Sequence, residues 1–364
     1  LLHEQQIGLS QSPLRFGKAD WGYATLKVRV STYNLRTAFW DPFASKDHPI
    51  ESVNTVVAYA STAYATMVPP TVSALFGTGM AGGFGTSAVA GVIDIVDKPD
   101  GNGEVTIKGV KPFSYGYADA YVINGTGHIS WATDLGTFQA PPSGRLTHVS
   151  TVEYTRLISI FECGSIAMFS LFDPGTLRQT LAITIYNHIA HGPMIHQSTL
   201  QSFYGDLMIF VEPETPTEML VSLGPGGRAI GVLNNATKEN PMGSGYAVEK
   251  GQTLRVRQTP YILAKSLFLI NDERVDLASR YSVRNPAVFF YHNRASEYLN
   301  QIEEATAKNG EDLVYSYSFA CWSYEQKAYK AMMDLIFQTI YTTVFFFLLL
   351  IPFVFIVESF LFGS

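Results

Sequence analysis

The chain has 364 residues, which is enough for two or three domains with cores of their own, and its formal net charge is −6. Only 15% of its residues are charged, against about 25% in an average protein. No basic patch stands out, which argues against a nucleic-acid partner. The many aromatic residues, 20 Tyr and 24 Phe, favour strands and surfaces that are buried against partners.

The first 93 residues contain one predicted strand and one uncharged stretch. Residues 23–35, YATLKVRVSTYNL, alternate in the manner of a strand, and the polar loop DPFASKDHP follows them. Residues 54–93 hold no charge, and small residues, Pro69–Pro70 and glycines dominate them. We expect strands and glycine-rich loops here, or a short helix. Packing against another chain, against the membrane or inside the protein's own core all remain open.

Short strands are predicted from Gly91 onward. Apolar and polar residues alternate, and PDGNG and NGTG provide turn signals, with Gly available for positive φ. Regular short strands between turns favour a β-sandwich over a parallel α/β sheet. The further strand candidates are RLISIFECGSIAMFSLF, TLAITIYNHI, DLMIFVEP, TEMLVSLG, AIGVLNN and TLRVRQ.

The apolar period changes near Tyr261, where helices are predicted. Residues 263–283 and 292–335 have helical patterns, and Asn309–Gly310 divides the second into two antiparallel helices, an αα-hairpin. No Gly- or Pro-rich segment separates this hairpin from the apolar run that follows. We therefore expect the upstream domain to be held at a fixed height above a membrane, and a cut after Asp334 to release it in soluble form.

Residues 335–357 predict a transmembrane helix. They are 23 uncharged residues, of which 17 are Leu, Ile, Phe or Val. A helix of this length spans about 34 Å, enough for a hydrocarbon core of about 30 Å. The 17 apolar side chains contribute roughly −5 to −10 kcal/mol to insertion. The predicted anchor residues are Leu335, Phe345, Leu349, Pro352, Phe355, Val357 and Glu358; a kink is expected at Pro352, and Glu358 is placed at the interface or against another helix.

The sidedness of the span has conflicting signals. Lys327 and Lys330 precede it, and the positive-inside rule would place them in the cytoplasm. The upstream sequence instead has an extracytoplasmic character, including glycosylation sequons at Asn124 and Asn235. We expect a single-pass protein of the cell membrane, with the bulk of the chain outside.

Catalytic chemistry has little support in the sequence. His188, His191 and His196 are metal-ligand candidates by their number, but no HExxH motif is present, and loop histidines are the favoured interpretation. The glycine-rich segments lack the context of a phosphate loop, and no G-x-S-x-G occurs. Cys163 and Cys321 are expected to be buried free thiols rather than a disulfide. We expect no catalytic residue, no cofactor and no enzyme.

The expected fold class is mainly β. Immunoglobulin-like or carboxypeptidase-regulatory-like β-sandwich modules are followed by a helical hairpin and one C-terminal transmembrane helix. The predicted divisions are a Gly/Ala-rich N-terminal region over 1–90, sandwich modules over 91–148 and 149–260, a hairpin over 261–333 and the span over 334–362.

The order of motifs from Gly91 onward resembles a class of uncharacterised archaeal and bacterial membrane proteins. The resemblance lies in GNGEVTIKGVKPFSYGYADAYVINGTGHISWATDLG, FECGSIAMFSLFDP, VLNNATKENPMGSGY, LFLINDERVDLASRYSVRNP and the block from WSYEQKAY to FFFLLLIPFVFIVESFLFG. It implies carboxypeptidase-regulatory-like β-modules, a helical hairpin and a transmembrane segment, which FtsX-type permease helices follow in some relatives. Relatives carry Glu-Arg after the span, where this chain has Glu358–Ser359. The resemblance implies no catalytic residues.

Three functions follow as hypotheses. The first is a non-catalytic, membrane-anchored extracytoplasmic protein, a surface assembly or an accessory subunit, whose partners are the lipid bilayer and other membrane or surface proteins, with a homo-oligomer as one form. The second is the extracytoplasmic part of a larger FtsX/ABC-type permease. The third is a membrane-bound metallohydrolase, and it depends on the three histidines alone.

Overall fold

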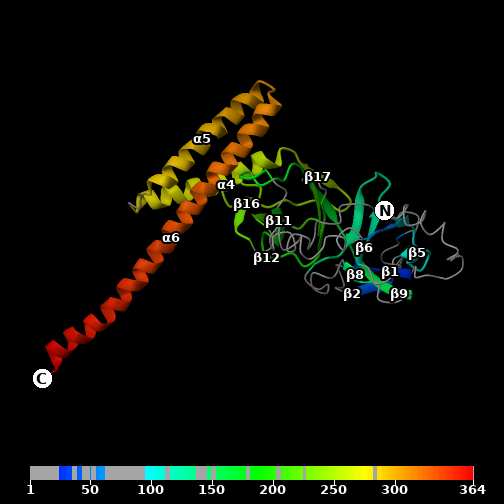
Figure 1. Cartoon of the computed structure of the whole chain (residues 1–364), viewed down its shortest axis with the longest axis horizontal. Helices are drawn as coiled ribbons and strands as arrows, with labels where there is room; N and C mark the ends of the chain where they lie inside the picture. The colour runs from blue at the N-terminus through cyan, green and yellow to red at the C-terminus, as the bar shows by residue number, and fades with distance from the viewer. Residues whose placement is uncertain are drawn as a thin grey trace, which may run out of the picture. The chain divides into compact units, whose positions relative to one another are not determined.

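The computed structural model describes residues 24–34, 39–42, 50, 55–61, 95–110, 115–136, 146–148, 153–177, 181–201, 206–223, 227–281 and 285–363. These residues form mostly β-strands in sheets, followed by helices of which the last is long and apolar (Figure 1). Most of the uncharged stretch predicted at 54–93, and most of the polar loop before it, lie outside the described residues.

The chain divides into two compact units, each built from separate stretches of sequence. The first unit comprises residues 1–167, 193–215 and 247–255, and the second comprises 168–192, 216–246 and 256–364. This division differs from the predicted one, which cut the chain into consecutive segments. Strands that are distant in sequence pair with one another, so the predicted boundaries at 90/91 and 148/149 fall inside a single sheet.

The first unit is built on a nine-stranded sheet. Its central order is β2-β1-β9-β7-β6-β3-β4, with β5 paired to β1 and β8 paired to β6. The pairing of β1 with β9 is parallel, and the other pairings are antiparallel. The strands are β1 (Ala24–Asn34), β2 (Phe39–Pro42), β3 (Thr55–Ser61), β4 (Ile95–Asp97), β5 (Glu104–Val110), β6 (Tyr115–Ile123), β7 (Ile129–Thr133), β8 (Leu146–His148) and β9 (Glu153–Glu162).

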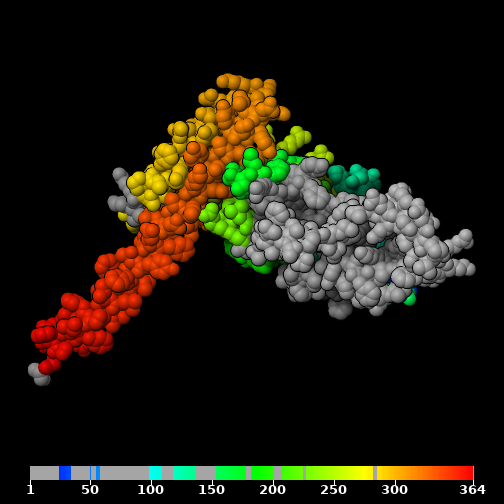
Figure 2. Space-filling model, viewed as in Figure 1, coloured from blue at the N-terminus to red at the C-terminus, as the bar shows by residue number. Residues whose placement is uncertain are grey.

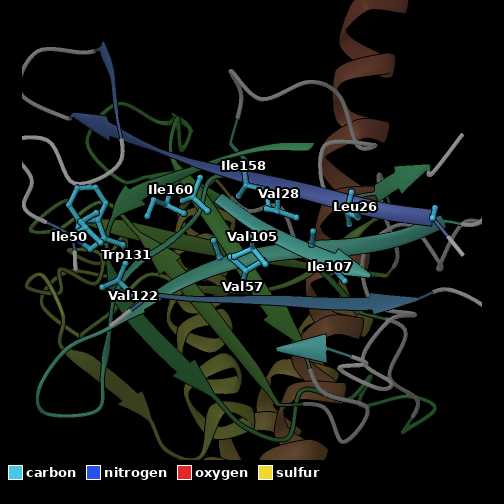
Figure 3. Packing of buried hydrophobic residues seen from close by; sticks show 14 residues of the cluster. Leu26, Val28, Ile50, Val57, Val105, Ile107, Val122, Trp131, Ile158 and Ile160 are labelled. Carbon is cyan, nitrogen blue, oxygen red and sulfur yellow. The ribbon is translucent and has the colours of Figure 1, made fainter. Parts of the chain in front are cut away.

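The core of this sheet follows from alternation along the strands. In β1, Leu26, Val28 and Val30 are buried, while Lys27 and Arg29 between them are exposed, as expected for a period of two. Figure 3 shows the buried side chains of β1, β3, β5, β6, β7 and β9 gathered in one cluster. Full burial of each such aliphatic side chain is worth about 1.5–3 kcal/mol.

The two predicted turn signals form turns. The Asp100 carboxylate accepts hydrogen bonds from the amides of Asn102 and Glu104 at 2.9 Å each, and Gly103 has φ 77°. In the β6–β7 connection, Asn124 Oδ1 accepts from the Thr126 and His128 amides at 3.0 and 2.9 Å. These are Asx-type turns, in which a side-chain acceptor replaces a backbone one.

Two four-stranded sheets complete the β structure. One has the order β13-β14-β10-β17 and belongs to the first unit except for the last residues of β10 and β17; the other, β12-β11-β15-β16, belongs mainly to the second unit. Six of their eight strands coincide with segments predicted from alternation, whereas β12 and β13 lie between those segments and were not predicted. The bounds are β10 (Gly164–Met168), β11 (Leu181–Asn187), β12 (Gly192–Pro193), β13 (Gln197–Gln201), β14 (Leu207–Val211), β15 (Thr217–Leu223), β16 (Ala229–Leu233) and β17 (Thr253–Val256).

Three helices follow in the described part of the chain: α4 (Thr259–Arg280), α5 (Pro286–Ala307) and α6 (Glu311–Phe362). A proline lies in the first turn of both α4 and α5, where its missing amide proton removes no intrahelical hydrogen bond. The Asn285 side chain caps α5 by accepting a hydrogen bond from the Ala287 amide at 2.9 Å. The α5–α6 break falls at Asn309–Gly310, where it was predicted, and Asn309 adopts φ 55°.

A buried tryptophan forms one of the links between the helices of the second unit and its sheet. Trp322 on α6 is fully buried, and its indole nitrogen donates a 2.7 Å hydrogen bond to the Ile230 carbonyl on β16. Gly231 allows this approach, because a Cβ there would lie 2.9 Å from Leu263 Cδ2 and 3.3 Å from Trp322 Nε1. The helical bundle is thus fixed to the sheet within the second unit.

Candidate functional site: the helix bundle and its apolar extension

The helix α6 changes character along its length without a break. At about 1.5 Å per residue its 52 residues extend about 78 Å. Its first half packs against α4 and α5 and buries Val314, Phe319 and Trp322, among others. From Ile336 onward nearly every residue is exposed, and Figure 2 shows this red segment extending beyond α4 and α5.

The exposed half is an apolar surface long enough to cross a membrane. The 18-residue window that qualifies as a candidate span is entirely unburied, which distinguishes it from the core helix of a globular domain. Three of the predicted anchor residues, Phe345, Leu349 and Phe355, are 60%, 51% and 67% exposed. Such exposure is expected of lipid-facing side chains when no bilayer surrounds them. A continuous apolar surface of this extent marks a membrane or protein contact.

The threonine hydroxyls of this segment are hydrogen-bonded within the helix. The hydroxyls of Thr339, Thr342 and Thr343 donate to the carbonyls four residues earlier at 2.8–2.9 Å. Internal pairing of this kind is what a hydrocarbon environment requires. Pro352 lies inside α6, as predicted, while Val357 is half-buried and Glu358 is exposed in the last turns. Leu335 lies at the boundary, because it packs against the bundle.

The bundle above this segment contains a buried histidine that contacts two carboxylates. His292 on α5 bonds through Nδ1 to Glu325 Oε1 on α6 at 2.9 Å, and through Nε2 to Asp272 Oδ1 on α4 at 3.1 Å. The Asn271 side chain donates to the other Glu325 oxygen and to the Glu325 carbonyl. The imidazole also stacks on Phe268, with ring centroids 4.5 Å apart. We call these side chains the histidine clamp, because they join all three helices.

The electrostatics of the histidine clamp favour a charged imidazole. Burial opposes that charge, but hydrogen bonds and attraction from Glu325 and Asp272 outweigh it, so the pKa of His292 is raised above its usual value. Burial raises the pKa of Glu325, although His292 and Asn271 donate to it. Both imidazole nitrogens are bonded, which leaves neither to take a proton from a substrate. The arrangement therefore joins helices rather than presenting a general base.

Of the three histidines predicted as metal candidates, His188 and His191 lie close together, with ring centroids 6.1 Å apart and the rings edge to face, and His196 belongs to the other unit. His196 belongs to the first unit, where its Nδ1 bonds to Asp134 Oδ2 at 2.7 Å in a buried pair. His188 and His191 belong to the second unit; His188 bonds to Glu218 at 2.9 Å, and His191 has φ 51° in the following turn. Within the described ranges, no group of three or more His, Cys, Asp or Glu side chains could hold a metal ion.

The remaining candidate residues have distinct environments. Asn124 is half-buried, and its amide nitrogen donates to the Gly251 carbonyl at 3.0 Å. Asn235 is exposed in the loop after β16. Cys163 and Cys321 are free and buried in different units, and burial raises the pKa of both thiols.

Sequence reasoning missed the histidine clamp. Its partners are separated by 20 and 33 residues, and no motif links them. One signal was present: Glu325 lies seven residues before Met332 and three after Trp322, on the face of α6 that is otherwise apolar. A single acid on an apolar helix face indicates a buried partner.

Comparisons with known proteins leave the family open. No family model matches the chain, and no curated protein matches it. Two similar solved structures are the Bacillus anthracis TIE protein, with 11% identity and a TM-score of 0.17, and the shaft pilin SpaA of Lactobacillus rhamnosus GG, with 8% identity and a TM-score of 0.22. Each match covers 64% of this chain, with 33% of the first protein and 95% of the second. The chain therefore spans about a third of the TIE protein. These scores are too low to define a fold.

Proposed function

We propose that this protein is a non-catalytic, membrane-anchored protein whose β-sandwich modules make protein–protein contacts at the membrane surface. The observation that carries the proposal is the continuity of α6, which begins inside a packed bundle and continues as an exposed apolar helix. A continuous helix transmits position and orientation, whereas a flexible linker would not. The bulk of the chain lies on the extracytoplasmic side in this proposal, and the exposed sequon at Asn235 is compatible with that side.

The mechanism is positional. The histidine clamp and the Trp322–Ile230 hydrogen bond fix α6 to the rest of the second unit. The span of α6 is then fixed relative to the sheet β12-β11-β15-β16, so that this sheet is held at a set height above the bilayer. The partner that the β modules contact would be another membrane or surface protein, or a second copy of this chain.

Alkaline carbonate extraction of membranes tests the anchor. The full chain is expected to stay in the membrane pellet and to need detergent for release. A chain that ends after Gln338 is expected to be soluble and folded, with the circular dichroism of a β/α protein. The cut is placed beyond Leu335 because that side chain packs against Val275, Val288 and Met332, so a cut after Asp334 would remove part of the core.

Two outcomes would contradict the proposal. Release of the full chain from the membrane by carbonate would show that α6 does not anchor the protein in the bilayer. A shortened chain that aggregates would show that the apolar half of α6 is needed to complete a fold rather than to hold a folded domain at a membrane.

A further inference from the structure

The end of the bundle that contains the α4–α5 connection carries large exposed apolar side chains. Leu277 and Tyr281 lie one helical turn apart at the end of α4, and they are 53% and 75% exposed. Phe290, in the second turn of α5, is 58% exposed. Arg280, also exposed, lies between the two α4 residues. We call Leu277, Tyr281 and Phe290 the bundle-end patch.

Contacts along the helices place this patch beside the start of the apolar half of α6. The helix α4 runs parallel to α6: Asn271 contacts Glu325, Arg274 lies over the Tyr329 ring, and farther along Val275 packs with Met332. Leu277 and Tyr281 continue in the same direction, toward residue 335. Leu277 therefore lies near the level of Asp334, and Tyr281, one turn farther on, lies level with the first turn of the apolar half.

The helix α5 runs antiparallel to α6 and gives the same level for Phe290. His292 contacts Glu325, Val288 packs with Met332, and Phe289 packs in the cluster that includes Leu335. Phe290 therefore lies between the levels of Glu325 and Leu335. Two helices thus place the bundle-end patch on both sides of Leu335, with Phe290 about six residues before it and Tyr281 about three residues beyond it.

These levels bracket the boundary between the headgroup layer and the hydrocarbon core of a bilayer that α6 crosses, with Phe290 at the outer edge of the headgroup layer. Met332 precedes the span by three residues, about 4.5 Å along the helix axis. The headgroup region on each side of the hydrocarbon core is about 5–7 Å thick. The side chains available there are those found at membrane interfaces: an exposed Tyr, apolar neighbours, and cations such as Arg280, Lys327 and Lys330.

We propose that the bundle-end patch is a second membrane contact, seated in the headgroup layer of the same bilayer that α6 spans. The inference rests on the proposed function, because it takes the apolar half of α6 as a membrane span. Its occupant is a lipid surface, since the patch lies at the depth where the apolar helix enters the bilayer. Contact with the bilayer through both α6 and the α4–α5 end of the bundle fixes the tilt of the bundle. Contact through α6 alone does not fix it.

The test uses the full chain with single-cysteine labels, reconstituted in phosphatidylcholine–phosphatidylglycerol vesicles. A polarity-sensitive fluorophore is attached in turn at Leu277→Cys, Tyr281→Cys and Phe290→Cys. Leu313→Cys is the matched control, because Leu313 is 51% exposed but lies at the opposite end of the bundle, 22 residues before Leu335. Leu348→Cys reports on the span itself. Cys163 and Cys321 are buried, and the unsubstituted chain shows whether they take up label.

The expected result is a blue-shifted emission from the labels at the three patch positions. Nitroxide attached to the lipid headgroup should quench this emission. The Leu313→Cys label should keep the emission of an aqueous probe and should not be quenched. The Leu348→Cys label should be quenched by nitroxide deep in the acyl chains. This pattern would support both the span and the patch contact.

The failures of the two proposals are distinguishable. If the Leu348→Cys label is quenched but the patch labels remain in water, α6 spans the bilayer and the second contact is overturned. If the patch labels are blue-shifted but not quenched by lipid nitroxide, a second copy of the chain covers the patch, and the lipid contact is again overturned. If the Leu348→Cys label is not quenched by lipid, the proposed anchoring itself fails.

Discussion

The two halves of α6 differ in which side chains they bury and which they expose. The half from Glu311 to Asp334 buries a carboxylate, Glu325, and leaves polar residues such as Ser316 in solvent. The half from Leu335 onward leaves Phe, Leu and Ile uncovered on every side. The first half is ordered by packing and by the histidine clamp, and the second half has the composition of a helix in lipid. A single uninterrupted helix therefore joins a packed half to an exposed apolar half that is long enough to span a membrane.

The largest expected effect comes from placing charge in the second half. Replacing both Phe346 and Leu349 with Arg adds about 5–7 kcal/mol to the cost of insertion, which is comparable to the whole gain from the apolar side chains. We expect the double variant to move from the membrane pellet to the carbonate supernatant. The matched control is Leu313→Arg with Ser316→Arg, two exposed positions in the first half. Loss of membrane retention in the control would remove the distinction between the halves.

The next effect concerns the histidine clamp. Glu325→Ala leaves a buried imidazole with one carboxylate fewer and an Asn271 amide without its acceptor. Breaking a buried pair by removing one partner costs about 3–5 kcal/mol, so we expect a loss of that size in the free energy of unfolding of the chain that ends after Gln338. Urea unfolding followed by circular dichroism measures it. Glu297→Ala, in the exposed pair with Arg294, is the control and should leave stability unchanged.

A smaller effect is expected at the contact between α6 and the sheet. Trp322→Phe keeps an aromatic ring but removes the donor to the Ile230 carbonyl, which then remains buried and unpaired. An unsatisfied buried group costs about 1–3 kcal/mol. The same unfolding measurement should show a loss in that range. An unchanged free energy would mean that the bundle is not fixed to the sheet through this bond.

The smallest effect is a pH dependence of the bundle. The folded-state pKa values of His292 and Glu325 are both raised, so each binds protons more tightly when folded. For both groups, stability is fully present below the unfolded pKa and is lost as pH rises through the raised folded pKa. For His292 that window begins near its unfolded value of about 6.5. Amide hydrogen-exchange protection factors of α5 and α6, which are corrected for the intrinsic exchange rate at each pH, should therefore be lower at alkaline pH than at mildly acidic pH.

The variant His292→Gln is the control for this pH dependence. It keeps a hydrogen-bonding side chain at the position but does not titrate. The difference in the protection of α5 and α6 between mildly acidic and alkaline pH should be smaller in the variant. Protection factors that rise with pH in the native chain would contradict the assignment of a charged imidazole to the histidine clamp.

Local patterns predicted the elements, and long-range pairings decided how they assemble. The alternation in β1, the turns at Asp100 and Asn124, and the break at Asn309–Gly310 depend on neighbouring residues, so the sequence was sufficient for them. The apolar length of α6 was visible for the same reason. The parallel pairing of β1 with β9 joins residues more than a hundred positions apart, and the predicted module boundaries consequently fell inside one sheet.

The candidate site divides in the same way. The predicted anchor residues lie on α6, and their prediction rests on a composition of 17 apolar side chains among 23 residues. The three loop histidines were close in sequence, but the chain passes from one unit to the other between His191 and His196. His292, Asp272 and Glu325 carry no spacing motif, since only the packing of three helices brings them together.

A cysteine-accessibility scan along α6 tests the central claim most directly. Single cysteines placed from Asp334 to Gly363 in the full chain, in sealed membrane vesicles, are treated with a membrane-impermeant maleimide. The account predicts labelling from one face of the membrane at Asp334, protection through the apolar segment 336–357, and labelling from the opposite face at Ser359 and beyond. Labelling of every position from the same face, with no protected segment, would contradict the claim that α6 continues from a folded bundle across the bilayer.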